Sequence, residues 1–184
     1  MRRIIALSLA ATALFGLTAC STSTGMDHTG HPSQSATADF SSADLMFAQM
    51  MIPHHEQAVD MSYLALANTQ NADVRALAES IITHQSTEVM TLKSWLDAAG
   101  VTLDESHSMH MQGMLTDSQM GELEAAKDGA FDTLWLEGMI MHHEGALLMA
   151  EEVTDSTNTE VAEFASHVIE DQTAEIKKMK DLLG

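Results

Sequence analysis

The sequence predicts an all-α protein, a four-helix bundle made of two repeated helix hairpins. An internal repeat is the first reason: residues 51–58, MIPHHEQA, match residues 139–146, MIMHHEGA, and residues 74–88 match residues 161–175. The second reason is that apolar residues recur at spacings of three and four after residue 41, whereas no stretch alternates convincingly as a strand would. Because each repeat spans a pair of helices, we expect two hairpins related by a pseudo-twofold axis.

Residues 1–19 are predicted to be a lipoprotein signal peptide. Two arginines precede a mostly apolar run over residues 4–17, which is too short for a transmembrane helix. The tetrad LTAC at residues 17–20 looks like a lipobox, and Cys20 is the only cysteine in the chain. The mature protein is therefore expected to be anchored to a membrane by lipid on Cys20, in the cell envelope outside the cytoplasm. A plain signal peptide with an accidental cysteine is the alternative.

Residues 20–40 are rich in Ser, Thr, Gly and Ala and have no apolar period, so they are predicted to form a flexible tether. The domain that follows, residues 41–184, has no thiol. A site for a soft metal would therefore use thioether and imidazole groups, which suits an oxidising compartment.

Four helices are predicted in this domain, at about 42–68, 72–98, 117–154 and 158–183. The first hairpin covers about 42–98 and the second about 117–183, and a His/Met-rich loop at 99–116 joins them. Start signals precede each helix: Ser41 with Asp44, Asn71 with Asp73, Thr116 with Gln119, and Thr157 with Glu160. A break in the third helix is expected near Asp128 and Gly129.

Paired histidines lie on the apolar seams of the first and third helices. His54 shares a seam with Met51 and Ala58, and His142 with Met139 and Ala146, so both should face the interior. His55 and His143 lie about 100° further round. The partner helices carry Gln85-x-x-Glu88 and Gln172-x-x-Glu175 on their seams. At about 1.5 Å per residue, the hairpin turns bring these eight side chains to one depth.

Two interpretations of this polar layer remain open. The first is a structural hydrogen-bonded network that fixes the register of the bundle, since buried polar groups must be satisfied. The second is a metal site. Methionines flank both histidine pairs and favour the second interpretation: Met50, Met51, Met139 and Met141. The remaining helical methionines are expected mainly to fill the core: Met46, Met61, Met90, Met120, Met149 and Met179.

The two histidine motifs, MMIPHHEQAVDM and MIMHHEGALLMA, each followed by a Gln-x-x-Glu helix, resemble the bacterial domain-of-unknown-function 305 family. The resemblance covers residues from about 40 to 183. It implies a ferritin-like four-helix bundle, often secreted or membrane-anchored, and some members are associated with copper binding and copper tolerance. The family motif maps onto His54, His55, Gln85, Glu88, His142, His143, Gln172 and Glu175, with the Gln and Glu residues as candidates for support around a metal.

The stretch SHSMHMQGM, residues 106–114, lies in the loop between the hairpins. We expect this loop to be exposed, so folding does not require its methionines. Five of its side chains are soft or nitrogen donors and are candidate metal ligands: His107, Met109, His110, Met111 and Met114. Thioether groups prefer Cu(I), whereas imidazole also holds Cu(II).

The function predicted first is therefore an extracytoplasmic copper-binding lipoprotein, a chaperone, buffer or resistance factor without catalytic residues. Copper, with Cu(I) favoured, is its predicted cargo, and a copper transporter or cuproprotein is its expected partner. A ferritin-like copper or iron oxidase using the two His-His pairs is an alternative, and a structural envelope lipoprotein is another. The formal net charge of −19 argues against nucleic acid as a partner, and the oligomeric state stays open.

Overall fold

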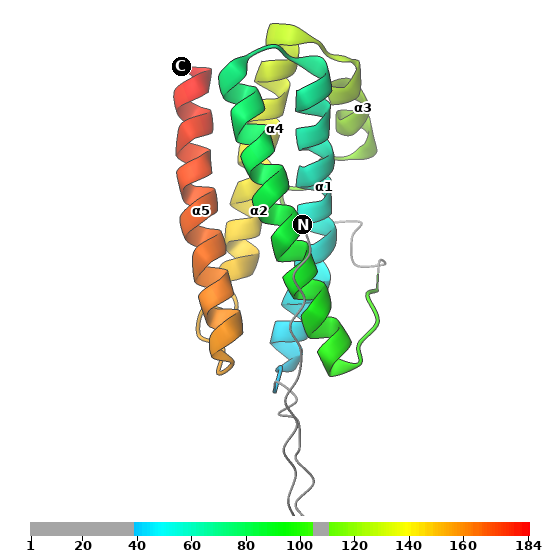
Figure 1. The fold of residues 1–184 in the computed structure, drawn as a ribbon, viewed down its shortest axis with the longest axis vertical. Coiled ribbons are helices and arrows are strands. Elements are labelled where there is room, and N and C mark those ends of the chain that lie inside the picture. The colour runs from blue at the N-terminus through cyan, green and yellow to red at the C-terminus, as the bar shows by residue number, and fades with distance from the viewer. Residues whose placement is uncertain (1–38, 105–110) are drawn as a thin grey trace, which may run out of the picture. The chain divides into compact units, whose positions relative to one another are not determined.

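The structure is a computed structural model that describes residues 39–104 and 111–184, and this part of the chain is all-α (Figure 1). Its helices are α1 (Ser42–Asn68), α2 (Ala72–Ala99), α3 (Asp117–Ala125), α4 (Asp128–Glu151) and α5 (Thr159–Leu183). The predicted all-α bundle is confirmed. None of these helices combines the length and the apolar character that a membrane crossing requires.

The four long helices form two hairpins, as the repeat predicts. α1 packs along α2, α4 packs along α5, and contacts between α1 and α4 join the two hairpins. Figure 1 shows these helices running along a common axis, with the short helix α3 beside α1. Because α3 belongs to the segment between the hairpins, residues 100–127, the described part of this connector from residue 111 onward runs alongside the bundle.

The third helix is where the expected boundaries differ most from the structure. The predicted helix at 117–154 is two helices, α3 and α4, and the chain breaks between Ala125 and Asp128. Asp128 has a φ of 49°, a left-handed conformation that a continuous helix does not allow. The break near Asp128 is therefore confirmed, but α4 ends at Glu151 and not at residue 154.

Capping explains where most of the helices begin. Ser41 and Asp44 form a capping box, with Ser41 N donating to Asp44 Oδ2 at 2.7 Å and Asp44 N to Ser41 Oγ at 3.1 Å. Thr116 and Gln119 form the same motif at α3, and Asn71 caps α2. The predicted start at Thr157 is one residue early, because Asn158 caps α5 through Glu160 N.

The core consists of two apolar clusters, one at each end of the bundle. One cluster includes Met61, Ile81, Trp135 and Met179, and the other includes Phe47, Leu92, Ala146 and Val168. Along each long helix the chain passes from one cluster to the other. Between the two clusters each helix contributes the polar residues of its repeat motif, so a polar layer divides the core.

Candidate metal centre

The polar layer contains the eight residues of the repeated motifs, two from each long helix. The four histidines come from the middle of α1 and α4, and each is at most 1 % exposed. Gln85 and Glu88 face them from α2, and Gln172 and Glu175 from α5. The structure therefore brings together the residues that the sequence places at one depth, although their role as metal ligands stays a prediction.

His54 and His142 form the centre of the layer. Their ring centroids are 3.8 Å apart and the rings are tilted by 38°. Burial, together with the nearby His55, lowers the pKa of His54 from 6.5 to about 3. Burial and the neighbouring His54 lower the pKa of His142 well below 6.5. Both imidazoles are thus neutral at physiological pH, which is the form that binds a metal.

His55 and His143 each lie against a glutamate from the partner helix of their own hairpin. His143 Nε2 is hydrogen-bonded to Glu175 Oε2 at 2.8 Å. His55 Nε2 lies 2.9 Å from Glu88 Oε2, close enough for an ion pair, although it is not aligned for a hydrogen bond. The two halves of the repeat thus use the same His–Glu contact, which fixes the ring orientation of each histidine.

None of the four Nδ1 atoms in the layer has a hydrogen-bond partner among the described residues. Nε2 of His54 contacts Gln112 O at 3.3 Å, so the ring donates there if it is neutral and protonated at Nε2. Within the described residues, Nδ1 of all four histidines is buried without a hydrogen bond, and so is Nε2 of His142. A histidine held through one nitrogen by a carboxylate or carbonyl, with the other nitrogen free, is arranged as metal-binding histidines usually are.

The amide groups of the layer are also incompletely satisfied. Both polar atoms of the Gln85 side chain lack partners within the described part of the chain, as does Gln172 Oε1. The imidazoles are paired and not gathered into one cluster: over residues 39–104 and 111–184, no three His, Cys, Asp or Glu side chains form a group able to hold a metal ion. The imidazole nitrogens of the layer are suitable donors for copper. A site with three or more ligands would need donors of another kind, or movement of these rings.

The connector between the hairpins closes the layer on one side. Its carbonyl at Gln112 contacts His54, and Gly113, with a φ of 90°, lies directly on α4. A Cβ on Gly145 would lie 2.0 Å from Gln112 O, so only glycine allows this approach. The expectation of an exposed loop therefore holds only in part for its described end: Gln112 is exposed, Met111 and Met114 are partly exposed, and Leu115 is buried.

Gln57 fastens the connector to α1. Its side-chain amide donates to Leu115 O at 2.9 Å and accepts from Leu115 N at 2.8 Å. Gln57 and Gly145 occupy the same position of the repeat, HHEQA against HHEGA. Sequence reasoning missed both residues and Gln112, although this mismatch inside a matching motif was the signal for where the repeat loses its symmetry.

The methionines near the histidines have different environments. Met51 and Met139 are fully buried, and they belong to opposite apolar clusters. Met141 is 39 % exposed and faces a groove beside Leu134 and Glu137. Met50, Met111 and Met114 are partly exposed.

The expectation that the other helical methionines fill the core holds for only some of them. Met61 and Met179 are fully buried, and Met120 packs against a core cluster. It is wrong for Met46 and Met90, which are 43 % and 64 % exposed. Met149 is partly buried at the edge of the core.

Several predicted features lie outside the described residues. They are the signal peptide, most of the tether, the lipidation site Cys20, and the candidate ligands His107, Met109 and His110. These remain predictions from the sequence.

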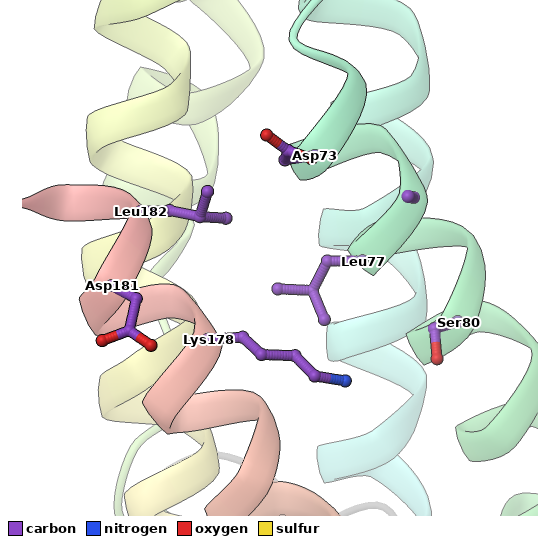
Figure 2. A pocket seen from close by; sticks show the side chains of 7 residues that line it. Asp73, Leu77, Ser80, Lys178, Asp181 and Leu182 are labelled. Carbon is purple, nitrogen blue, oxygen red and sulfur yellow. The ribbon is translucent and has the colours of Figure 1, made fainter.

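A groove of about 580 Å³ lies between α2 and α5, away from the histidine layer (Figure 2). Figure 2 shows Leu77 and Lys178 extending into the space between the two helices. Its lining is Asp73, Ala76, Leu77, Ser80, Lys178, Asp181 and Leu182. None of these residues is a histidine or a methionine, so this groove offers no soft ligands.

The fold and the layer define an all-α bundle of two hairpins with paired histidines in its core. Residues 44–183 match the model of the family described as a domain of unknown function, DUF305, and the chain belongs to this family. Among curated proteins none matches the chain.

Solved structures of related proteins have the same fold. A DUF305 protein from Streptomyces coelicolor is 33 % identical with a TM-score of 0.73, over 77 % of this chain and 90 % of that one. A DUF305 fragment from Deinococcus radiodurans is 28 % identical with a TM-score of 0.71, over 78 % and 97 %. CopM in its Cu(I)-bound form is 29 % identical with a TM-score of 0.64, over 76 % and 94 %.

Proposed function

We propose that this chain is an extracytoplasmic copper-binding protein that holds copper at the His54–His142 pair. The observation that carries the proposal is a pair of neutral, buried imidazoles whose nitrogens are largely free. Burying such polar atoms without partners costs about 1–3 kcal/mol each, and a bound metal ion would recover that cost. The copper ion would be held by coordination and passed on by ligand exchange. No catalytic residue is needed.

The similarity to CopM supports copper as the cargo. CopM has been solved in Cu(I)-bound and Cu(II)-bound forms, and the Cu(II) form is 30 % identical to this chain with a TM-score of 0.66. Imidazole binds both oxidation states, and the chain adds many thioethers, which favour Cu(I). A carboxylate-bridged iron site has less support, because Glu88 and Glu175 are each engaged by a histidine.

The location and the partners follow from this cargo. The relative from Streptomyces coelicolor is named as a protein inferred to be secreted. This agrees with the location outside the cytoplasm that we propose for this chain. Within this proposal the chain is anchored by lipid at Cys20. It buffers or carries copper for a transporter or a cuproprotein, or protects the envelope from excess copper.

Competition for copper with the mature chain tests the proposal. We expect His54→Leu with His142→Leu to weaken Cu(I) affinity at least tenfold in anaerobic competition with a chelator, because both central imidazoles are lost. His84→Leu with His167→Leu is the matched control, since it also removes two histidines, both exposed. Equal affinities for the two variants would contradict the proposal.

A second comparison separates the core from the connector. In a variant with His107→Ser, Met109→Leu and His110→Ser, residues 111–115 keep their contacts with α1 and α4. We expect this variant to keep the copper held by the core histidines and to lose only copper held by the connector. Loss of all copper binding would place the site in the connector instead.

A further inference from the structure

A second groove, of about 400 Å³, lies between the N-terminal half of α1 and the C-terminal end of α4. Three methionines line it, Met46 and Met50 from α1 and Met149 from α4, with the carboxylate residue Glu152 beside them. The thioethers are accessible: Met46 is 43 % exposed, and Met50 and Met149 are partly exposed. This exposure is unusual for a residue that normally fills apolar cores.

The groove ends next to the histidine layer. Gln112 and Gly145 are among the residues that line it, and the Gln112 carbonyl contacts His54 Nε2 at 3.3 Å. Met46, Met50 and His54 follow one another at intervals of four residues on α1. Each interval advances about 6 Å along the helix on nearly the same face. The methionines thus form a row of donors that leads from the surface toward the central imidazoles.

The repeat shows that helix packing alone does not require these methionines. With the offset of 88 residues between the two histidine motifs, Met46 corresponds to Leu134 and Met50 to Gly138. These two α4 residues line a groove of about 210 Å³ whose other wall comes from α3 and the connector, with two glutamates and a single methionine, Met141. On α4 the repeat thus accepts leucine and glycine at the positions of Met46 and Met50, whereas Met149 corresponds to the buried core residue Met61. The groove between α1 and α4 brings the three methionines together.

We propose that the groove between α1 and α4 is a separate binding site for Cu(I), with Met46, Met50 and Met149 as thioether ligands. Thioethers select soft monovalent ions, carry no proton that must leave on binding, and leave the hard ions of the surroundings unbound. The acidic side chain of Glu152 favours a cation at the groove. The choice of copper rests on the proposed function, whereas the site itself does not depend on the histidine pair.

Methionine-methyl NMR on the mature chain tests this site without altering it. Ag(I) is used as the probe, because it is a closed-shell ion with the same preference for thioethers. We expect the ε-methyl resonances of Met46, Met50 and Met149 to shift together, within one equivalent in the variant with His54→Leu and His142→Leu and within two equivalents in the wild type, whose histidine pair can take up the first ion. Resonances of these three residues that stay unshifted after two equivalents in the histidine variant would overturn the inference.

Variants give the second measurement. Replacing Met46, Met50 and Met149 by leucine conserves volume and should keep the fold, and we expect Cu(I) capacity to fall by about one equivalent. Replacing Met90, Met120 and Met179 by leucine is the three-for-three control, because none of them is a candidate ligand, and it should leave the Cu(I) capacity unchanged. Unchanged capacity in the first variant contradicts the groove site.

The two sites can fail separately. If the groove methyls do not shift but the histidine variant loses copper, the groove inference fails and the proposed function stands. If the groove methyls shift but the histidine variant keeps its full affinity, the histidine site fails and the groove site stands.

Discussion

The four histidines of the layer are held differently, although the two halves of the chain repeat one motif. His55 and His143 have glutamate partners, and His54 has the Gln112 carbonyl at its Nε2. His142 makes no hydrogen bond of normal geometry on either nitrogen within the described residues, although the backbone of His54 lies close to its ring. The central pair therefore has three of the six buried histidine nitrogens that lack a hydrogen bond within the described residues, and copper binding is the use that we propose for it.

Replacing the central pair by apolar residues should stabilise the copper-free protein. His54→Leu with His142→Leu removes three buried nitrogens that lack partners, and we expect the free energy of unfolding at pH 7 to rise by about 1–3 kcal/mol. Urea unfolding of copper-free protein measures this change. A lower free energy of unfolding would mean that these imidazoles are satisfied in solution.

The same two residues should make the copper-free protein sensitive to mild acid. The pKa of His54 is about 3 in the folded state and 6.5 in the unfolded chain, so below pH 6.5 only the unfolded state takes up this proton. The stability is therefore complete above pH 6.5 and falls as the pH drops toward 3. Between pH 7 and pH 5, His54 alone should lower the free energy of unfolding by about 2 kcal/mol, and His142 should lower it further.

Urea unfolding at several pH values between 7 and 5 checks this dependence. The range lies above the ordinary pKa values of carboxylates, so it isolates the histidines. In the variant with both central histidines replaced by leucine, the free energy of unfolding should change less with pH than in the wild type. Parallel profiles for the two proteins would contradict buried, neutral imidazoles.

At the scale of elements, the connector is held by a residue from each hairpin. Gly145→Ala would place a Cβ 2.0 Å from Gln112 O. Because both groups belong to packed backbone, we expect this substitution to lower the free energy of unfolding by about 1–3 kcal/mol. Gly121→Ala in α3 is the control. Nothing lies within 4 Å of its Cβ, so helix propensity should give a gain of about 1 kcal/mol. Thermal unfolding of both variants checks this: the melting temperature should fall for Gly145→Ala and rise for Gly121→Ala.

Gln57 should act on the same segment from the other side. Gln57→Ala removes two hydrogen bonds to Leu115, at about 0.5–1.5 kcal/mol each. Once either anchor is lost the segment is partly released, so Gln57→Ala and Gly145→Ala together should cost less than their sum. A double-mutant cycle measures this coupling, and strict additivity would show that the two residues act on the connector independently.

The elements and the layer could be predicted from the sequence because both depend on periodic spacing. His54 and His142 recur on apolar seams, and equal distances from the hairpin turns place their Gln and Glu partners opposite them. The position of the connector could not be predicted in this way. It depends on contacts between residues distant in the sequence, such as Gln57 with Leu115 and Gly145 with Gln112. The exposure of Met46 likewise depends on how α1 and α4 meet.

Across the whole molecule, two apolar clusters provide the stability and the polar layer between them opposes it. The bundle keeps this costly layer in the middle of its core, where all four long helices contribute to it. A ligand bound there contacts both hairpins, so binding should stabilise the complete bundle. The unfolded chain does not hold these imidazoles in the same arrangement.

Copper should therefore raise the melting temperature of the whole domain. At a free copper concentration about 100 times Kd, the wild type should gain about 2.7 kcal/mol, which for a domain of this size is a rise on the order of 5–10 °C. The variant with both central histidines replaced by leucine should begin at a higher melting temperature without copper and gain less from it. The difference in melting temperature between the variant and the wild type should thus become smaller as copper is added under anaerobic conditions. At high copper concentration the wild type can have the higher melting temperature. Equal rises for both would show that the stabilising copper binds elsewhere, because a site between α1 and α4 that excludes the histidines would be unaffected by their loss.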